Sequence, residues 1–447
     1  MPCRTSPIGP SRTVIAACVA CVCAAASWAS AQFRVPASLP PEQAVRFERF
    51  KSFRINGVCG DRDIERLASF GVNTIRGYTI SKPEEMLSRL DRYEELGLKM
   101  VISEWMPHHG ENKDHRGWTW DFDYEEAGDG LVERFTAKVE AIGDHPAILM
   151  WGLGNEVHLD EPYLRTVNRM SEAVHERFPA HLTSLTMINA KPEAIEKIKA
   201  FAPDLDVIGV QSYSPGAVRN SIRNMEEHWR KPFYVSEFNT KGPWNFGKTE
   251  WGEAFDEPED AKLEDLADCY RAIDASPLCL GSTIFVWGYF RNNRPTYFSL
   301  LLDEHPDGPA AKDGKSDLLM TPRAEWMVEH FTQQPFRGNR APVLTKLETA
   351  DGQRWASAEP GDRIRVRLAA TDPDGDGVRY ACWVLDSKPG RPKAVSGPFE
   401  FDAVETVDLP APAKPGEYLV MAYALDGRGG GSASTLPLLV KRRGVEE

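Results

Sequence analysis

Short apolar runs alternate with amphipathic stretches between about residue 50 and residue 335 of the 447-residue chain. Each run has the length of a buried strand, and each interval between runs can hold a helix. Eight runs can be distinguished: Phe53–Val58, Asn73–Tyr78, Lys99–Glu104, Ala147–Trp151, Leu182–Thr186, Val207–Gln211, Phe233–Val235 and Ser282–Trp287. Eight such units, with no glycine-rich phosphate loop after the first strand, predict one (β/α)8 TIM barrel and not a doubly wound sheet.

Boundary signals support this division into helices. Ser81 with Glu84 three residues later has the pattern of a capping box, and Gly97 follows the last turn of the same helix. Two further helices are expected to stop before Pro179 and Pro203, because proline cannot continue the hydrogen-bond ladder.

The pattern changes after Pro335. The segments Ile364–Ala369, Val378–Val384 and Tyr418–Ala424 alternate like half-buried strands between Pro, Gly and Asp turns. We therefore expect the barrel over residues 32–335 and an immunoglobulin-like β-sandwich over residues 336–447.

An acidic turn in this second region resembles part of a calcium loop. It contains Asp372, Asp374 and Asp376, but the twelfth position of an EF-hand count falls on Trp383 and not on glutamate. Tight-turn chemistry is the simpler explanation, with calcium binding as the alternative.

The first 31 residues have the layout of an export signal. Arg4 and Arg12 precede the apolar run Thr13–Ala26, and small residues precede a cleavage point before Gln32. We expect a secreted or periplasmic protein, with lipid anchoring at Cys18 as an alternative. No later stretch reaches the roughly 18 apolar residues of a membrane span.

Charge and cysteine content narrow the partners. Loss of the two arginines with the signal would change the formal net charge from −13 to −15, which disfavours nucleic acid as a partner. Four cysteines remain beyond the signal, without zinc-ligand spacing. A disulfide between Cys269 and Cys279 and buried free thiols are both open interpretations.

Two glutamates follow predicted strands. Asn155 and Glu156 come after the fourth run, and Glu237 comes after the seventh. Strand carboxyl ends meet at the catalytic mouth of a TIM barrel, so the two carboxyls can converge on one substrate. A protonated and an ionised carboxyl suit glycoside cleavage. Either glutamate alone could be a structural residue, whereas the pair favours catalysis.

The segments Trp151–Glu156 and Ser236–Glu237 resemble the large clan of retaining (β/α)8 glycosidases. The nearest likeness is to the barrel domain of family 2 glycoside hydrolases, with some similarity to β-1,3-glucanases and β-1,3-glucanosyltransferases. The resemblance implies Glu156 as acid/base, Glu237 as nucleophile and Asn155 as partner of the sugar 2-hydroxyl. Family 2 enzymes usually carry two domains before the barrel, and about twenty residues stand there in this chain, so galactosidase or glucuronidase specificity is not expected.

Other strand ends and loops supply candidate substrate contacts. By the same resemblance Arg76 would hold the nucleophile ionised. Trp287 would offer a sugar platform, although core packing is its alternative. The loop Trp105–Tyr124 is assigned to substrate, not to metal, although it contains His108, His109, His115, Trp118 and Trp120. The complete set of candidate substrate contacts is Asn155, Arg76, Tyr78, Trp105, Tyr213, Trp287 and Trp244, and Trp251 is a weaker candidate in the loop Lys241–Asp256.

These observations predict a retaining hydrolase of β-linked glycans, with β-glucan favoured and no cofactor or metal required. A transglycosylase on the same site and a non-catalytic carbohydrate-binding protein are the alternatives. The expected partner is an oligosaccharide or polysaccharide, and the sequence does not indicate an oligomeric state. The C-terminal region is expected to be a spacer.

Overall fold

The computed structural model describes residues 33–108, 122–290, 294–306, 318–387, 393–402 and 404–442. The predicted export signal lies outside the described residues, and so do His109, His115, Trp118 and Trp120. Within the described ranges no helix is long and apolar enough to cross a membrane.

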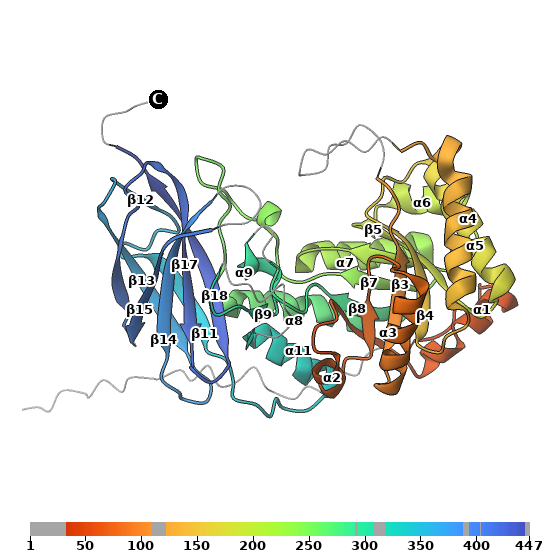
Figure 1. The fold of residues 1–447 in the computed structure, drawn as a ribbon, viewed down its shortest axis with the longest axis horizontal. Coiled ribbons are helices and arrows are strands. Elements are labelled where there is room, and N and C mark those ends of the chain that lie inside the picture. The colour runs from red at the N-terminus through yellow and green to blue at the C-terminus, as the bar shows by residue number, and fades with distance from the viewer. Residues whose placement is uncertain are drawn as a thin grey trace, which may run out of the picture. The chain divides into compact units, whose positions relative to one another are not determined.

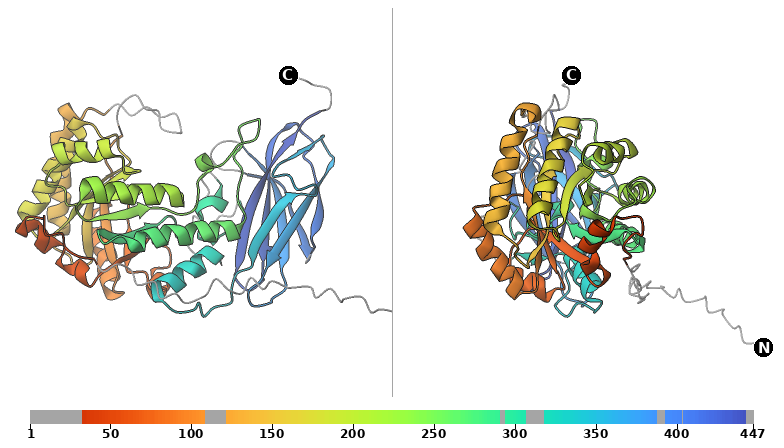
Figure 2. Two further views of the ribbon diagram at one scale, coloured as in Figure 1. Left: turned by 180° about the vertical axis from the view of Figure 1, so that it is seen from behind. Right: turned by 90° about the vertical axis from the view of Figure 1, so that its right-hand side faces the viewer.

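Eight parallel strands close into a barrel in the order β1 to β8, and helices cover its outside (Figure 1, Figure 2). This confirms the predicted TIM barrel. The strands are β1 Ile55–Cys59, β2 Thr74–Arg76, β3 Lys99–Glu104, β4 Ile148–Asn155, β5 Thr183–Ile188, β6 Val207–Gln211, β7 Phe233–Glu237 and β8 Cys279–Ile284. The helices up to the end of the barrel are α1 Pro41–Arg46, α2 Ile64–Ser69, α3 Pro83–Glu95, α4 Tyr124–Ile142, α5 Glu161–Arg177, α6 Pro192–Phe201, α7 Pro215–Asn224 and α8 Glu259–Ala275.

Three short helical turns, η1 Glu48–Lys51, η2 Met225–Trp229 and η3 Pro243–Asn245, complete this part. After β8 follow α9 Pro295–Phe298, the paired strands β9 Leu301–Leu302 and β10 Leu319–Met320, and α11 Pro322–Thr332.

An aromatic cluster closes the end of the barrel where the strands begin. Phe33, Phe47 and Phe50, which precede β1, pack in one buried group with the strand-start residues Ile55 and Val207. The opposite end, where the strands finish, is the end at which TIM barrels place their chemistry.

The start of α3 differs from the sequence prediction. Its N-cap is Lys82 without a side-chain cap, and Pro83 occupies the first turn. The hydroxyl of Ser81 is buried without a hydrogen-bond partner. The capping-box prediction is therefore wrong at Ser81, because Pro83, with its fixed φ and no N–H to cap, defines the first turn in its place.

Two sheets form the C-terminal region, which confirms an all-β arrangement after the barrel. One has the order β11-β13-β16 and the other β12-β18-β17-β14-β15, and apolar residues of both share one buried cluster. The immunoglobulin-like assignment and the boundary at residue 335 stay predictions. The strands are β11 Val343–Thr349, β12 Ala356–Ala358, β13 Arg363–Thr371, β14 Arg379–Asp386, β15 Lys393–Asp402, β16 Thr406–Pro410, β17 Gly416–Leu425 and β18 Gly431–Val440.

The barrel and the larger sheet share a hydrophobic core. Barrel-side residues such as Met327 and Tyr289 belong to the same buried cluster as Trp383 and Tyr423 of the sheet. Residues 31–447 accordingly form one compact unit.

A buried polar network also joins the two parts. Asp256, in the loop before α8, accepts hydrogen bonds from the N–H and the hydroxyl of Thr435 on β18, both at 3.1 Å. The same carboxylate pairs with Lys262 of α8 at 3.0 Å, and both side chains are almost fully buried.

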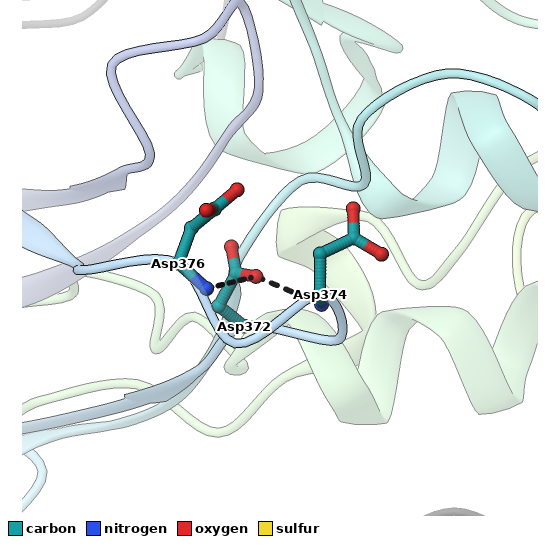
Figure 3. Close-up of side chains that lie close together, drawn as sticks. All are labelled: Asp372, Asp374 and Asp376. Atoms are coloured by element: carbon teal, nitrogen blue, oxygen red, sulfur yellow. Dashed lines mark hydrogen bonds between the residues drawn. The ribbon is translucent and has the colours of Figure 1, made fainter.

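The acidic turn between β13 and β14 is organised by Asp372, whose Oδ1 accepts from the backbone N–H groups of Asp374 at 2.9 Å and Asp376 at 3.1 Å (Figure 3). Asp376 also pairs with Arg428 at 3.1 Å. Carboxylate oxygens of the three aspartates lie within 4.8 Å of one another. Hydrogen bonding within the turn accounts for the position of Asp372.

The cysteines of the described ranges are buried free thiols, and these include Cys269 and Cys279. This settles the open question of their pairing in favour of free thiols.

Candidate active site

Glu237 ends β7 with only 6% of its surface exposed, and its carboxylate accepts hydrogen bonds from side chains of two other strand ends. Its Oε1 accepts from Arg76 Nη1 at 2.6 Å, from Tyr78 Oη at 2.8 Å and from Gln211 Nε2 at 2.7 Å. Its Oε2 accepts from Tyr213 Oη at 2.7 Å. Four donors, one of them charged, hold this carboxylate in one orientation.

Arg76, the last residue of β2, lies buried beneath this group. Its Nη2 donates to Asn155 Oδ1 at 2.7 Å, and its guanidinium lies 4.5 Å from the centre of the Tyr78 ring. A buried guanidinium is tolerated only when it is paired. Arg76 therefore both compensates the charge of Glu237 and fixes Asn155.

The orientation of the Asn155 amide follows from its neighbours. Asn155 Oδ1 accepts from Arg76 Nη2 and from Gln211 Nε2, the latter at 2.6 Å. Because two donors converge on the oxygen, the amide nitrogen faces away from them. That nitrogen is the atom able to donate to a substrate hydroxyl.

Glu156 follows β4 in an unusual backbone conformation. Its φ is +56°, a left-handed value that is uncommon for a residue with a side chain. The preceding turn needs glycine at Gly154, which has a φ of +96° and where a Cβ would overlap Tyr163 Oη. The Glu156 N–H donates to the Thr186 carbonyl at 3.1 Å, which holds the turn against β5. Strained backbone of this kind is concentrated at functional sites.

Burial and the nearby charge of Glu237 raise the pKa of Glu156 to about 7, and the charge of Arg76 opposes the rise. The two glutamates are therefore close enough for their charges to interact. Near neutral pH Glu156 can carry a proton, as the acid of a glycoside cleavage must.

Two exposed tryptophans stand near the strand ends. Trp105 directly follows β3 with 39% exposure, and its ring lies 5.7 Å from that of His108. Trp244, in η3 after β7, is 58% exposed and lies 5.5 Å from the ring of Tyr213. Exposed aromatic faces at the mouth of a barrel suit the apolar faces of pyranose rings.

Trp287 lies in the core. It is 2% exposed, its Nε1 donates to the Arg62 carbonyl at 2.8 Å, and its ring packs edge-on against Phe70. This burial favours the core-packing alternative over a sugar platform. Because β8 ends at Ile284, Trp287 lies three residues beyond the strand end and not at it.

Trp251, the weaker candidate in the loop Lys241–Asp256, packs against another part of the chain. Its ring lies 5.4 Å from that of Trp355 in the all-β region.

The structure adds two residues that sequence reasoning did not select. Gln211, the last residue of β6, contacts both Glu237 and Asn155. Phe285, half-buried directly after β8, lies 6.2 Å from the ring of Tyr213. The sequence signal that could have identified Gln211 is its position at the end of the apolar run Val207–Gln211. Tyr78 was predicted as a substrate contact, and in the structure its hydroxyl donates to Glu237 Oε1.

Cys59, which ends β1, lies close to the same group. Burial raises the pKa of its thiol to about 11, so the thiol is uncharged at neutral pH and is a poor nucleophile. Over the described ranges, residues able to hold a metal ion come together only at the Asp372 turn, in the all-β region.

Residues 53–254 match the family model for the TIM barrel domain of glycosyl hydrolases family 2. The matched segment is similar to the barrel domain of family 2 glycosyl hydrolases. The match extends from the start of β1 into the loop after β7, so the matched segment contains Glu156, Glu237 and the four side chains that donate to Glu237. None of the curated proteins compared matches the chain.

Solved structures resemble the chain more distantly. A Bacteroides uniformis β-glucuronidase is 13% identical, with a TM-score of 0.45, and the match covers 88% of this chain and 46% of that one. A Ruminococcus gnavus β-glucuronidase in complex with D-glucuronic acid is 16% identical, with a TM-score of 0.40 and coverage of 54% and 43%. The Ignisphaera aggregans GH53 catalytic domain is 15% identical, with a TM-score of 0.39 and coverage of 61% and 94%. The chain thus spans about half the length of the glucuronidases.

Proposed function

We propose that the protein is a retaining β-glycoside hydrolase that uses Glu237 as nucleophile and Glu156 as acid/base. The observation that carries this proposal is the contrast between the two carboxyls in one site. Glu237 accepts four hydrogen bonds, whereas burial raises the pKa of Glu156 to about 7.

In the first step Glu237 Oε2 attacks the anomeric carbon. Three donors hold Oε1, so Oε2 is the oxygen with the greater capacity to form a new bond. The bond between the anomeric carbon and the leaving oxygen breaks, and Glu156 transfers its proton to that oxygen. The product is a glycosyl ester of Glu237 and a free leaving group.

In the second step Glu156, now a carboxylate, takes a proton from water. The water oxygen attacks the anomeric carbon, and the ester bond to Glu237 breaks. Both carboxyls return to their starting states. The amide nitrogen of Asn155 is placed to donate to the sugar 2-hydroxyl in both steps.

The substrate we favour is a β-linked glycan, and among glycans a β-glucan. Trp105 and Trp244 supply exposed aromatic faces for neutral sugar rings. The signal-like residues 1–31 support action outside the cytoplasm. A transglycosylase would share the covalent intermediate but release it to a sugar hydroxyl.

Labelling with a 2-fluoro β-glycoside tests the proposal, because the fluorine slows release and leaves the sugar on the nucleophile. We expect the sugar on the peptide that contains Glu237. We also expect proton NMR early in the reaction to show a first-formed product with the β configuration, because two successive inversions at the anomeric carbon restore the configuration of the substrate.

Labelling of another residue, or an α product formed first, would contradict the proposal. Aryl β-glycosides, β-glucans, mannans and β-glucuronides together form the substrate panel. Binding without turnover on the whole panel would favour the carbohydrate-binding alternative, and products longer than the substrate would favour transglycosylation.

A further inference from the structure

Gln211 lies in the site but has no role in the two proposed reaction steps. It is 1% exposed and ends β6. Its Nε2 donates to Glu237 Oε1 at 2.7 Å and to Asn155 Oδ1 at 2.6 Å. One amide group therefore joins the nucleophile to the residue that faces the sugar.

The orientation of this amide is fixed by charge. If the group were turned over, its oxygen would lie 2.7 Å from a carboxylate oxygen, which is repulsive. In the orientation present, Gln211 Oε1 is buried without a hydrogen-bond partner. An unsatisfied buried carbonyl is destabilising, so the contact with Glu237 is kept at a cost to folding.

We propose that Gln211 is a positioning residue that holds Glu237 Oε1, so that Oε2 attacks the sugar and the carboxylate leaves readily in the second step. This inference rests on the proposed function. In the covalent intermediate Oε2 is bonded to the anomeric carbon, and Oε1 is the carbonyl oxygen of the ester. When water displaces the ester, the electron pair of the breaking bond returns to the carboxylate and is shared with Oε1.

The donors on Oε1 therefore stabilise the departing carboxylate in the second step. Arg76 supplies the positive charge and Tyr78 supplies a hydroxyl. Gln211 adds a third donor without a second charge. The three donors together orient the carboxylate about its own axis.

The reactivation rate of the 2-fluoroglycosyl enzyme measures the second step directly. Loss of one hydrogen bond to a charged group corresponds to a rate change of roughly tenfold to a hundredfold. We expect Gln211→Met to slow reactivation by that factor.

A matched control is Ser212→Ala. Ser212 is the next residue along the chain, and its hydroxyl makes buried hydrogen bonds to Asn189 at 3.0 Å and Ser221 at 2.9 Å. The substitution removes buried hydrogen bonds from the same strand end without contact to the Glu237 side chain. Reactivation should stay as in the unmodified protein.

The second variant, Gln211→Glu, keeps the side-chain size and covers the case in which Gln211→Met does not fold. Its introduced carboxyl can donate to Glu237 only when protonated. We expect partial reactivation at acidic pH that disappears as the pH rises. Unchanged reactivation in folded Gln211 variants would overturn the inference. Absence of label on Glu237 in the unmodified protein would instead refute the proposed function.

Discussion

Three glutamates at barrel strand ends differ in what surrounds them. Glu104 ends β3 but forms an ion pair with Lys138 of the outer helix α4 at 2.6 Å. Glu237 accepts four donors, and Glu156 is buried close to a like charge. At the residue scale, environment and not residue type distinguishes the two roles that we propose for Glu156 and Glu237.

The pH dependence of activity follows from Glu156. Its carboxyl must be protonated in the free enzyme, and its pKa is about 7, so kcat/KM should fall about tenfold per pH unit above that value. The measurement is kcat/KM between pH 4 and pH 10 on a substrate with a poor leaving group.

A substrate with a good leaving group is the control for this profile, because it needs little protonation and should show a weaker basic limb. A flat profile up to pH 9 on the poor leaving group would show that Glu156 is not the acid. As a second check, Glu156→Ala with added azide should form a glycosyl azide, because the small anion attacks the intermediate without help from a base.

The apolar runs predicted all eight barrel strands because buried parallel strands are marked by composition alone. Their ends were less predictable. The run Ser282–Trp287 continues beyond β8, which ends at Ile284, and this shift misplaced Trp287. Likewise, the pattern at Ser81 satisfied a capping rule that Pro83 overrides.

The site was predictable where strand ends carry charge. Glu156 and Glu237 follow from their positions after buried strands, and Arg76 follows from the resemblance to retaining glycosidases. The hydrogen bonds of Gln211 depend on how three strand ends meet in space, which one apolar run does not encode.

At the scale of elements, the turn after β4 depends on Gly154. Gly154→Ala would force a Cβ into Tyr163 Oη at a φ of +96°. We expect a loss of about 2–4 kcal/mol in the free energy of unfolding. Activity should fall further than stability, because the same turn places Asn155 and Glu156. Urea unfolding and kcat/KM are the two measurements.

Gly97→Ala is the matched control for that substitution. Gly97 has a φ of +71°, but a Cβ there would meet no atom within 4 Å. Only the backbone strain remains, about 1 kcal/mol. Equal losses in the two variants would indicate that the overlap with Tyr163 is relieved by a small movement.

The whole molecule behaves as a unit because the barrel and the larger sheet share a core. The loop that carries Trp244 ends at Asp256, which is bound to β18 through Thr435. The spacer role expected for the C-terminal region therefore does not account for the hydrogen bonds between β18 and the loop that carries Trp244.

Asp256→Ala tests this coupling. It leaves Lys262 buried without its carboxylate partner, and the loss of one partner from a buried ion pair costs about 3–5 kcal/mol. We expect a lower midpoint for a single unfolding transition followed by both near-ultraviolet circular dichroism and tryptophan fluorescence.

Asp408→Ala is the control, since Asp408 forms an exposed pair with Arg365 and its removal should leave the midpoint nearly unchanged. Two separate transitions in the unmodified protein would show that the barrel and the sheets unfold independently.

The attachment of the barrel loop to β18 also bears on the order in which the molecule is completed during synthesis. Thr435 is made 179 residues after Asp256, its partner in the barrel loop. A nascent chain can close the eight-stranded barrel before Thr435 has left the ribosome. Until then, Asp256 lacks the hydrogen bonds from Thr435 that anchor the end of the loop carrying Trp244. We therefore expect the enzyme to become active only after β18 is released.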